Sequence, residues 1–336
     1  MRNLSSLPLS RRLLLQAGAA QLATAGLAGT SMVQAQSTTP AFPTRTIELV
    51  VPWQAGGGAD VVARAFGVSA ASHLPQPIVV VNRPGATGLL GMKDVLGAKP
   101  DGYKLLLTTN EITFVKHLGQ GKYSPDDVRP IARLNADPIA IVARTDSGYK
   151  NLNDLLAAAR QPGANVRVGN AGQGSTLHMA ALALCQRAGV EFNHIPFAGG
   201  APALQALLGG HIDAVSITTA EAANYVTAGT LRPLGVMAER RLSNLPEVAT
   251  LRETGIDLTV SLWRALAAPK GTPDAVMAVL RTAAAQAARE PVLLDTLKKL
   301  QFSADSYGDH TVMAAQMERD SALFKELIEQ VQLKLS

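Results

Sequence analysis

Short apolar runs and longer stretches of helical spacing alternate along the chain. The run from Ile47 to Val51 has the length of a strand, stops at Pro52 and is followed by glycines at 56–58. Apolar residues then return at helical spacing, at Val61, Val62, Ala65 and Phe66. This order predicts a buried strand, a glycine-rich loop and an α-helix, because strands and helices bury residues with different periods.

Two further strands are predicted to end in loops of glycine, hydroxyl and amide residues. The strand Pro77 to Val81 leads into the loop Asn82 to Gly88 and then a helix from about Leu89 to Gly97. The strand Lys104 to Thr108 leads into Thr109-Asn110. Ligands of open α/β sheets bind outside the carboxyl ends of the strands, so we expect these loops to line a binding site.

The same order returns in the second half of the chain. Val166 to Val168 reads as a strand, Gly169 to Gly174 as its loop, and Ser175 as the cap of the next helix. Two similar α/β lobes that face one another would produce such a recurrence.

The remaining pattern predicts further strands and helices. The strands are expected at Ile131–Ala143, Asp213–Thr218, Leu234–Met237 and Val260–Ala268. Helices are expected at Asn151–Arg160, Pro273–Arg289, Pro291–Leu300 and Asp309–Val331, and one more has Pro202 in its first turn. We place crossings between lobes near Ala143 to Ser147 and along Val260 to Ala268. The first lobe would then be discontinuous (42–143 plus 264–336), the second would be 144–263, and hinge and cleft would lie between them.

The amino-terminal residues 1–35 have the composition of an export signal. Arg11-Arg12 precedes a mildly apolar run that reaches about Val33, and small residues at Val33 and Ala35 suit a signal peptidase. We expect cleavage near Ala35 and a periplasmic mature protein. The paired arginines resemble a twin-arginine signal, and a general secretion signal is the alternative.

Composition excludes several classes of function. The chain has 336 residues, 47% of them hydrophobic and 17% charged, which is typical of a globular protein. Three of the 31 basic residues lie in 1–35, which holds no acid, leaving 28 basic against 26 acidic residues. Without a basic stripe we predict no nucleic-acid binding. Cys185 is the single cysteine, so no internal disulfide and no cysteine-based metal site is expected.

The sequence carries no motif of a common enzyme class. HExxH, the P-loop and the Gly-x-Ser-x-Gly elbow are absent, and Leu177 stands where a dinucleotide fingerprint needs its third glycine. We therefore predict no catalytic residue, metal or cofactor. Ser175 and His178, one helical turn apart, leave an exported hydrolase or transferase as the alternative.

The glycines at 56–58 favour an anion site built from the backbone. A helix that opens at such a loop presents unpaired N–H groups and the positive end of its dipole. Asp60 stands where an N-cap or first-turn acid is expected. An ordinary strand-to-helix turn is the alternative interpretation.

Eight segments taken in order resemble the substrate-binding proteins of tripartite tricarboxylate transporters, the Bug family. They are VPWQAGGGADVVAR, VNRPGATGLLG, AKPDGYKLLL, GNAGQGSTLHMAA, IPFAGGAPALQALLGGHIDA, AGTLRPLGV, LPEVATLRETGI and APKGTPDAV. The resemblance covers about Phe42 to Gly308. It implies a type II periplasmic binding protein fold, in which two α/β lobes close on a solute through a hinge.

The resemblance also implies where a small organic carboxylate would bind. The first-lobe residues are Trp53, Ala55, Gly56, Gly57, Gly58, Asp60, Thr87, Thr109 and Asn110. The second-lobe residues are Asn170, Gly172, Gln173, Ser175, Thr176 and Thr218. The implied partners are membrane transporter subunits, with a sensor subunit of a signalling receptor as the alternative. We expect a monomer.

Two positions depart from the family pattern. The strand after Asp213 reads Ser216 to Thr219 where many members carry Phe-Asp, which argues against an amino-acid ligand. Arg264 follows Trp263 where many members have a small or aromatic residue, and it adds a candidate cation to the cleft.

Overall fold

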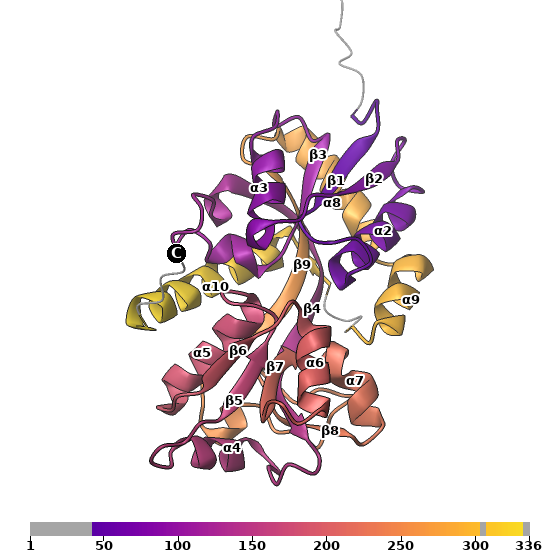
Figure 1. The fold of residues 1–336 in the computed structure, drawn as a ribbon. Coiled ribbons are helices and arrows are strands. Elements are labelled where there is room, and N and C mark those ends of the chain that lie inside the picture. The colour runs from indigo at the N-terminus through magenta and orange to yellow at the C-terminus, as the bar shows by residue number, and fades with distance from the viewer. Residues whose placement is uncertain (1–41, 303–306, 332–336) are drawn as a thin grey trace, which may run out of the picture. The chain divides into compact units, whose positions relative to one another are not determined.

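The computed structural model describes residues 42–302 and 307–331 (Figure 1). The chain divides into the units Met1–Ala41 and Phe42–Ser336, and the described residues belong to the second. The predicted signal peptide, 1–35, lies outside the described residues. In the part that is described, no helix is long and apolar enough to cross a membrane.

The first half of the chain builds a mixed sheet. Its parallel strands lie in the order β2 (Ile78–Asn82), β1 (Ile47–Val51) and β3 (Lys104–Thr108). β9 (Ser261–Pro269) pairs antiparallel with β3, and β4 (Val128–Arg144) pairs antiparallel with β9. The two-residue β10 (Gly308–Asp309) pairs with β4. β1 and β3 have the predicted bounds.

The carboxyl-terminal part of β4 belongs to a second sheet. Its parallel strands are β6 (Asn193–Pro196), β5 (Arg167–Asn170) and β7 (Ala214–Thr218). β4 pairs antiparallel with β7 and with β8 (Leu231–Val236). Pro138 still pairs with Ser261 of β9, whereas Ile139 pairs with Thr218 of β7.

The change of sheet therefore falls earlier than the predicted crossing at Ala143 to Ser147. The physical reason is that β4 is one continuous strand of 17 residues, so the chain passes between sheets without a turn. The pattern of apolar residues is the same on both sides of the change. The division into 42–143 plus 264–336 and 144–263 stays a prediction.

The helices cover the faces of these sheets. They are α2 (Gly58–Ala70), α3 (Leu89–Leu96), α4 (Leu152–Ala159), α5 (Thr176–Ala188), α6 (Gly200–Leu208), α7 (Thr219–Thr227), α8 (Asp274–Ala287), α9 (Pro291–Lys299) and α10 (His310–Val331). Short 3-10 turns are η1 (Ala86–Gly88), η2 (Asn110–Thr113), η3 (Pro125–Asp127) and η4 (Arg252–Thr254). The predicted cap of α5 is confirmed, since the Ser175 hydroxyl accepts the His178 N–H at 3.2 Å.

Strand directions place the loops. β3 is parallel to β4 because both are antiparallel to β9, and β7 is antiparallel to β4. β1 and β2 share the direction of β3, and β5 and β6 share that of β7. The carboxyl ends of the two parallel sets therefore point toward each other, and the loops that follow these strands line the space between the sheets.

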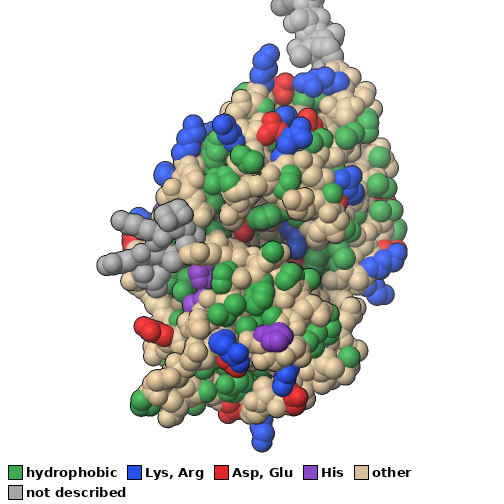
Figure 2. Space-filling view, viewed as in Figure 1, with side chains coloured by type: hydrophobic (Ala, Val, Ile, Leu, Met, Phe, Trp, Pro, Cys, Tyr) green, Lys and Arg blue, Asp and Glu red, His purple; other side chains and the backbone are tan. Residues whose placement is uncertain are grey.

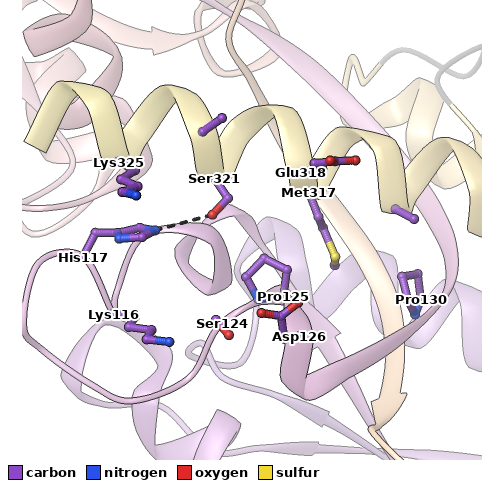
Figure 3. A pocket seen from close by; sticks show the side chains of 12 residues that line it. Lys116, His117, Ser124, Pro125, Asp126, Pro130, Met317, Glu318, Ser321 and Lys325 are labelled. Carbon is purple, nitrogen blue, oxygen red and sulfur yellow. Dashed lines mark hydrogen bonds between the residues drawn. The ribbon is translucent and has the colours of Figure 1, made fainter.

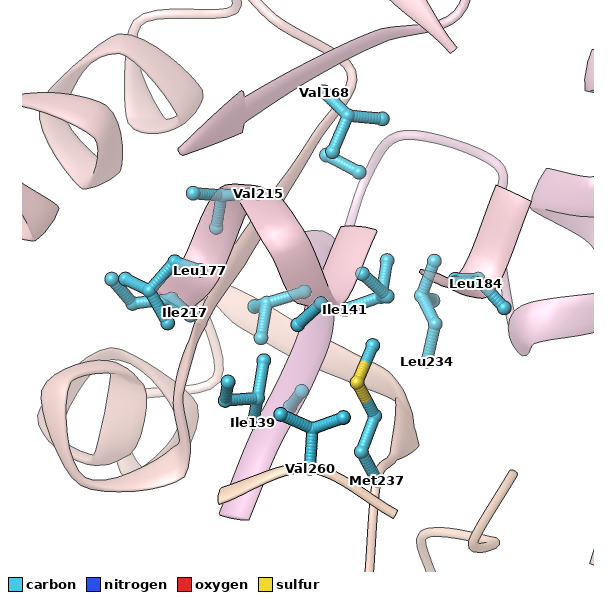
Figure 4. Packing of buried hydrophobic residues seen from close by; sticks show 14 of the residues in the cluster. Ile139, Ile141, Val168, Leu177, Leu184, Val215, Ile217, Leu234, Met237 and Val260 are labelled. Atoms are coloured by element: carbon cyan, nitrogen blue, oxygen red, sulfur yellow. The ribbon is translucent and has the colours of Figure 1, made fainter. Parts of the chain in front are cut away.

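Buried side chains form three cores, one on each face of the first sheet and one around the second sheet. α2, α8 and α9 cover one face of the first sheet, and α3 and α10 cover the other, where Trp263 is fully buried. The second sheet's core centres on residues such as Ile141 and Val215 (Figure 4). Phe324 of α10 and Phe114 also pack into this core. The two halves are thus joined by packed side chains as well as by β4 and β9.

Candidate functional site

The loops after the parallel strands line a cleft. The face in view in Figure 2 is hollowed between the ends of the two sheets, with acidic and basic side chains inside the hollow. The predicted first-lobe residues follow β1, β2 and β3, and the predicted second-lobe residues follow β5 and β7. The topology therefore brings both sets to the same cleft.

The amino terminus of α2 is open toward this loop region. Gly57 is the N-cap and has no side chain to accept a hydrogen bond, so the N–H groups of 58–60 have no acceptor within the helix. Gly56 adopts a φ of +82°, which strongly favours glycine. The segment 54–57 is exposed. The glycines thus leave backbone donors free for an anion.

Asp60 holds this loop in place. Its carboxylate is only 3% exposed and accepts hydrogen bonds from the Gly56 N–H (2.8 Å), from Arg64 Nε (3.0 Å) and from Asn82 Nδ2 (2.9 Å). Burial works to raise the pKa of Asp60, but the hydrogen bonds from Arg64, Gly56 and Asn82 outweigh it and hold the pKa below its usual value. Asp60 and the Gly56 N–H therefore satisfy each other, and the contacts give Asp60 a positioning role.

The amino terminus of α5 is occupied by a residue that the sequence analysis did not single out. Glu111 of η2 is 4% exposed, and its carboxylate accepts the hydroxyls of Thr109 (2.5 Å) and Thr176 (3.0 Å). Burial raises the pKa of Glu111, against the hydrogen bonds from the two threonines. Thr109 and Thr176 are therefore brought together as predicted, but around a side chain of the protein.

His178 closes the rest of the α5 terminus. Its Nδ1 accepts the Gly174 N–H at 3.0 Å, which leaves the proton of the neutral ring on Nε2. Burial and the neighbouring His194 lower the pKa of His178 to about 4, so the ring is neutral. The Ser175 hydroxyl accepts the His178 backbone N–H, and among the described residues no hydrogen bond joins this hydroxyl to the imidazole. The Ser175/His178 pair lacks the contact that a nucleophile and its base require.

Other predicted site residues have mixed surroundings. The Asn110 amide is fully used: it donates to the Ser261 carbonyl (3.0 Å) and to Asp320 (3.2 Å) and accepts the Trp263 N–H (3.1 Å). The Thr218 hydroxyl donates to Glu221 and caps α7. Thr87 lies in η1 with a φ of +53°. Asn110 and Thr218 thus have structural partners.

Several buried side-chain polar atoms have no hydrogen-bond partner among the described residues. Three of them are N–H donors of residues that the sequence had singled out: Trp53 Nε1, Asn170 Nδ2 and Arg264 Nε. Leaving a buried donor unpaired costs about 1–3 kcal/mol, so such groups are rare and ask for an acceptor. Trp53 and Asn170 belong to the predicted set, and the sequence had marked Arg264 as a candidate cation. What they have in common is a need for acceptor oxygens.

Arg264 is a buried cation beside the first loop. It is 8% exposed, donates from Nη1 to Asp137 at 3.1 Å, and lies over the Phe302 ring at 4.5 Å. Its Nη2 would be 3.1 Å from a Cβ placed on Gly58. The guanidinium therefore lies next to the first residue of α2.

A separate pocket of about 480 Å³ lies between α10 and the segment after η2 (Figure 3). Lys116 and Lys325 lie on one side of it and Asp126 and Glu318 on the other, and His117 is 3.5 Å from the Ser321 hydroxyl. It contains none of the predicted site residues. Within the described ranges, no group of three or more His, Cys, Asp or Glu side chains is placed to hold a metal ion.

The fold and the facing loops define a two-lobed periplasmic solute-binding protein. A TctC solute binding protein from Polaromonas, solved without ligand, aligns with a TM-score of 0.77 and 45% identity, covering 86% of this chain and 99% of its own. MatC from Rhodopseudomonas palustris, solved with bound malate, aligns with a TM-score of 0.73 and 30% identity, covering 85% of this chain and 100% of its own.

Sequence comparison gives the family. The pattern of the tripartite tricarboxylate transporter family receptor matches residues 62–333. The "UPF0065 protein in gbd 5'region" of Cupriavidus necator is 33% identical over 323 residues, 94% of this chain and 97% of its own. The chain belongs to this receptor family, which confirms the resemblance, the fold class and the reading as a receptor instead of an enzyme.

Proposed function

We propose that this chain captures a small organic carboxylate in the cleft and delivers it to the membrane subunits of a tripartite tricarboxylate-type transporter. The observation that carries the proposal is the open amino terminus of α2, where the N–H groups of 58–60 have no side-chain cap. Carboxylates bind well at such termini because the donors and the helix dipole both favour negative charge. Membership of a receptor family supports the same function.

The ligand would be held mainly by the first loop. We propose that Trp53, Ala55 and the backbone at Gly57 and Gly58 contact it, and that Asn170, Gly172 and Gln173 meet it from the second sheet. Thr87 and Ser175 complete the lining, and Thr218, whose hydroxyl bonds to Glu221, would act indirectly. Asp60, Thr109, Asn110 and Thr176 would act indirectly, since their polar groups already have partners in the protein.

The kind of ligand is supported by a relative. MatC carries malate, a dicarboxylate, and aligns over 85% of this chain. A small dicarboxylate is therefore the first candidate here. We further propose that the lobes 42–143 plus 264–336 and 144–263 close by a hinge at β4 and β9, that residues 1–35 are removed near Ala35, and that the receptor acts as a monomer.

A thermal-shift screen tests this function. The mature protein is unfolded and refolded to remove any carried ligand, then mixed with mono-, di- and tricarboxylates, aromatic acids and amino acids. A ligand at 100 times its Kd stabilises the folded state by about 2.7 kcal/mol, so one acid class should raise Tm selectively. The neutral amides of the same acids are the control. If no acid raises Tm, the carboxylate receptor function is wrong.

The same samples address the enzyme alternative. After incubation with protein, the acid that gives the largest shift is recovered and analysed by mass spectrometry. A receptor returns it unchanged. Conversion that is lost on Ser175→Ala would contradict the proposal, because an alanine there removes the only hydroxyl that a Ser175/His178 mechanism could use.

A further inference from the structure

We propose that Arg264 binds a carboxylate of the ligand directly, beside the amino terminus of α2, and makes the cleft select the ionised acid over its neutral amide. This inference rests on the proposed function and adds a side-chain cation to a site otherwise built from backbone. Four observations support it: the position of Arg264 in β9, its contacts, its unpaired donor and the glycine opposite.

The register of β9 places Arg264 at the cleft. Ala265 pairs with Thr108, the last residue of β3, and Arg264 is the next residue toward the second sheet. Leu266 and Ala268, which share its side of the strand, pack in the core covered by α2, α8 and α9. Arg264 therefore lies on the α2 side of the sheet, level with the loops that follow the parallel strands.

The guanidinium is held but not fully used. Asp137 accepts from Nη1, and the guanidinium carbon lies over the Phe302 ring, so two contacts hold the group in place. Asp137 also accepts the Asn135 amide at 2.8 Å, so its Oδ2 is shared between two donors. Nε has no partner among the described residues although the side chain is only 10% exposed. A structural ion pair alone leaves this donor unexplained.

A ligand carboxylate supplies the missing acceptor. The planar guanidinium presents its N–H groups as a fork that matches two carboxylate oxygens, and Nη2 lies beside Gly58. An oxygen bound by the N–H groups of 58–60 would have the cation as its neighbour. The ligand oxygen would then receive hydrogen bonds and positive charge from both the α2 terminus and Arg264.

The glycine at position 58 permits this approach. A Cβ there would lie 3.1 Å from Arg264 Nη2 and 3.2 Å from Phe302 Cζ. Both contacts are tighter than ordinary van der Waals separation, so a side chain would displace the guanidinium or the ring. Gly58 thus serves the close packing of Arg264 against the helix terminus.

Binding to three acids tests the role of Arg264 by isothermal titration. The probes are malate, adipate and the acid with the largest shift in the screen, each compared with its neutral amide. The variants are Arg264→Lys, which keeps the charge without the fork, and Arg264→Met combined with Asp137→Asn, which avoids an unpaired buried carboxylate. Arg167→Met with Asp213→Asn is the matched control. This Arg–Asp pair lies at the amino-terminal ends of β5 and β7, whereas the predicted site residues follow the carboxyl ends of these strands.

We expect the double variant at 264 and 137 to bind the acid at least tenfold more weakly and to lose its preference for the acid over the amide. A tenfold loss corresponds to 1.4 kcal/mol. Arg264→Lys should fall between this variant and the wild type, and the control pair should leave Kd unchanged. Circular dichroism and Tm verify that each variant is folded.

Two results would overturn the inference in distinguishable ways. If the wild type binds an acid and the folded double variant binds it equally well, Arg264 is a structural residue and the proposed function stands. If the wild type binds no acid, both the inference and the proposed function are wrong. A variant that loses Tm but keeps Kd also argues for a purely structural pair.

Discussion

The side chain of Asp320 shows how a buried carboxylate can depend on pH. It accepts hydrogen bonds from Trp263 Nε1 (2.6 Å), Gln316 Nε2 (2.8 Å) and Asn110 Nδ2 (3.2 Å). Burial raises its pKa to about 6 from a usual 3.8, although the hydrogen bonds oppose the shift. The folded state therefore holds this proton over a range in which the unfolded chain has lost it.

This shift predicts a pH-dependent stability. Because the folded-state pKa is the higher one, the contribution of Asp320 is complete below about pH 4 and is lost as pH rises through about 6. The substitution Asp320→Asn removes this pH-dependent contribution to stability. The free energy of unfolding of the wild type minus that of the variant should fall by on the order of 1–3 kcal/mol between pH 4 and 7, measured by urea unfolding. If the free energies of unfolding of the two proteins change with pH in parallel, the raised pKa of Asp320 is wrong.

At the scale of single residues, the sequence indicated where the candidate site residues lie. It did not indicate which partners their polar groups bind. The loops after β1, β3 and β5 were expected to line one site, and the strand directions bring them to the space between the two sheets. The hydroxyls of Thr109 and Thr176 instead bond to Glu111, and the Asn110 amide bonds to Ser261, Trp263 and Asp320. A sequence does not show whether a polar group faces solvent or a neighbour distant in the chain. Glu111 carried one signal, an acid three residues after the end of β3.

At the scale of elements, the predicted and observed helices and strands agree best where the hydrophobic pattern is strong. β1 and β3 are apolar runs and were predicted with their bounds, and the Ser175 cap located α5. β6 was missed because its four residues, Asn193–Pro196, are partly exposed and carry little apolar pattern. α7 was not predicted: it begins at Thr219, directly after β7, in a segment to which the sequence analysis assigned no element.

The amino terminus of α2 gives a prediction for this helix and its ligand together. Gly57→Asp places a carboxylate at the N-cap, where it accepts the N–H groups that we assign to the ligand. The helix gains a cap, so stability should change by less than about 0.5 kcal/mol relative to glycine. Affinity for the acid found in the screen should fall at least tenfold, measured by isothermal titration.

Gly57→Ala is the matched control for this test. The φ of −75° suits alanine, and its Cβ would meet the Gln54 carbonyl at 3.4 Å, an ordinary contact. Alanine is a poor N-cap and should cost about 1 kcal/mol of stability, while affinity stays within about threefold of the wild type. Equal affinities for the aspartate variant and the wild type would show that the ligand does not use the α2 terminus.

At the scale of the whole described molecule, the two halves are joined in more ways than the sequence suggested. The alternation of strands and helices predicted two crossings by the chain. It did not predict that Phe324 and Phe114 pack into the second core, because helical periodicity shows that a face is buried but not against which sheet. Glu111 adds a polar link, since it comes from η2 and bonds to Thr176 at the start of α5.

The Glu111–Thr176 bond predicts a measurable coupling between the halves. Intramolecular hydrogen bonds contribute about 0.5–3 kcal/mol, depending on whether a partner is charged, and burial raises the pKa of Glu111. A double-mutant cycle with Glu111→Met and Thr176→Val, both of similar size to the native side chains, should give a coupling energy of about 1–3 kcal/mol in urea unfolding. Additive effects of the two changes would show that the bond does not form in solution.

The same variants separate this link from ligand binding. The side chain of Glu111 already accepts the hydroxyl of Thr176 at the α5 terminus, so the ligand's carboxylate belongs at α2 and Arg264. Folded Glu111→Met should therefore keep the acid's Kd within about threefold while its Tm falls, because it loses a structural bond. If the variant binds the acid more than tenfold more tightly, Glu111 competes with the ligand for α5. The α5 terminus would then be part of the binding site, as the sequence had predicted.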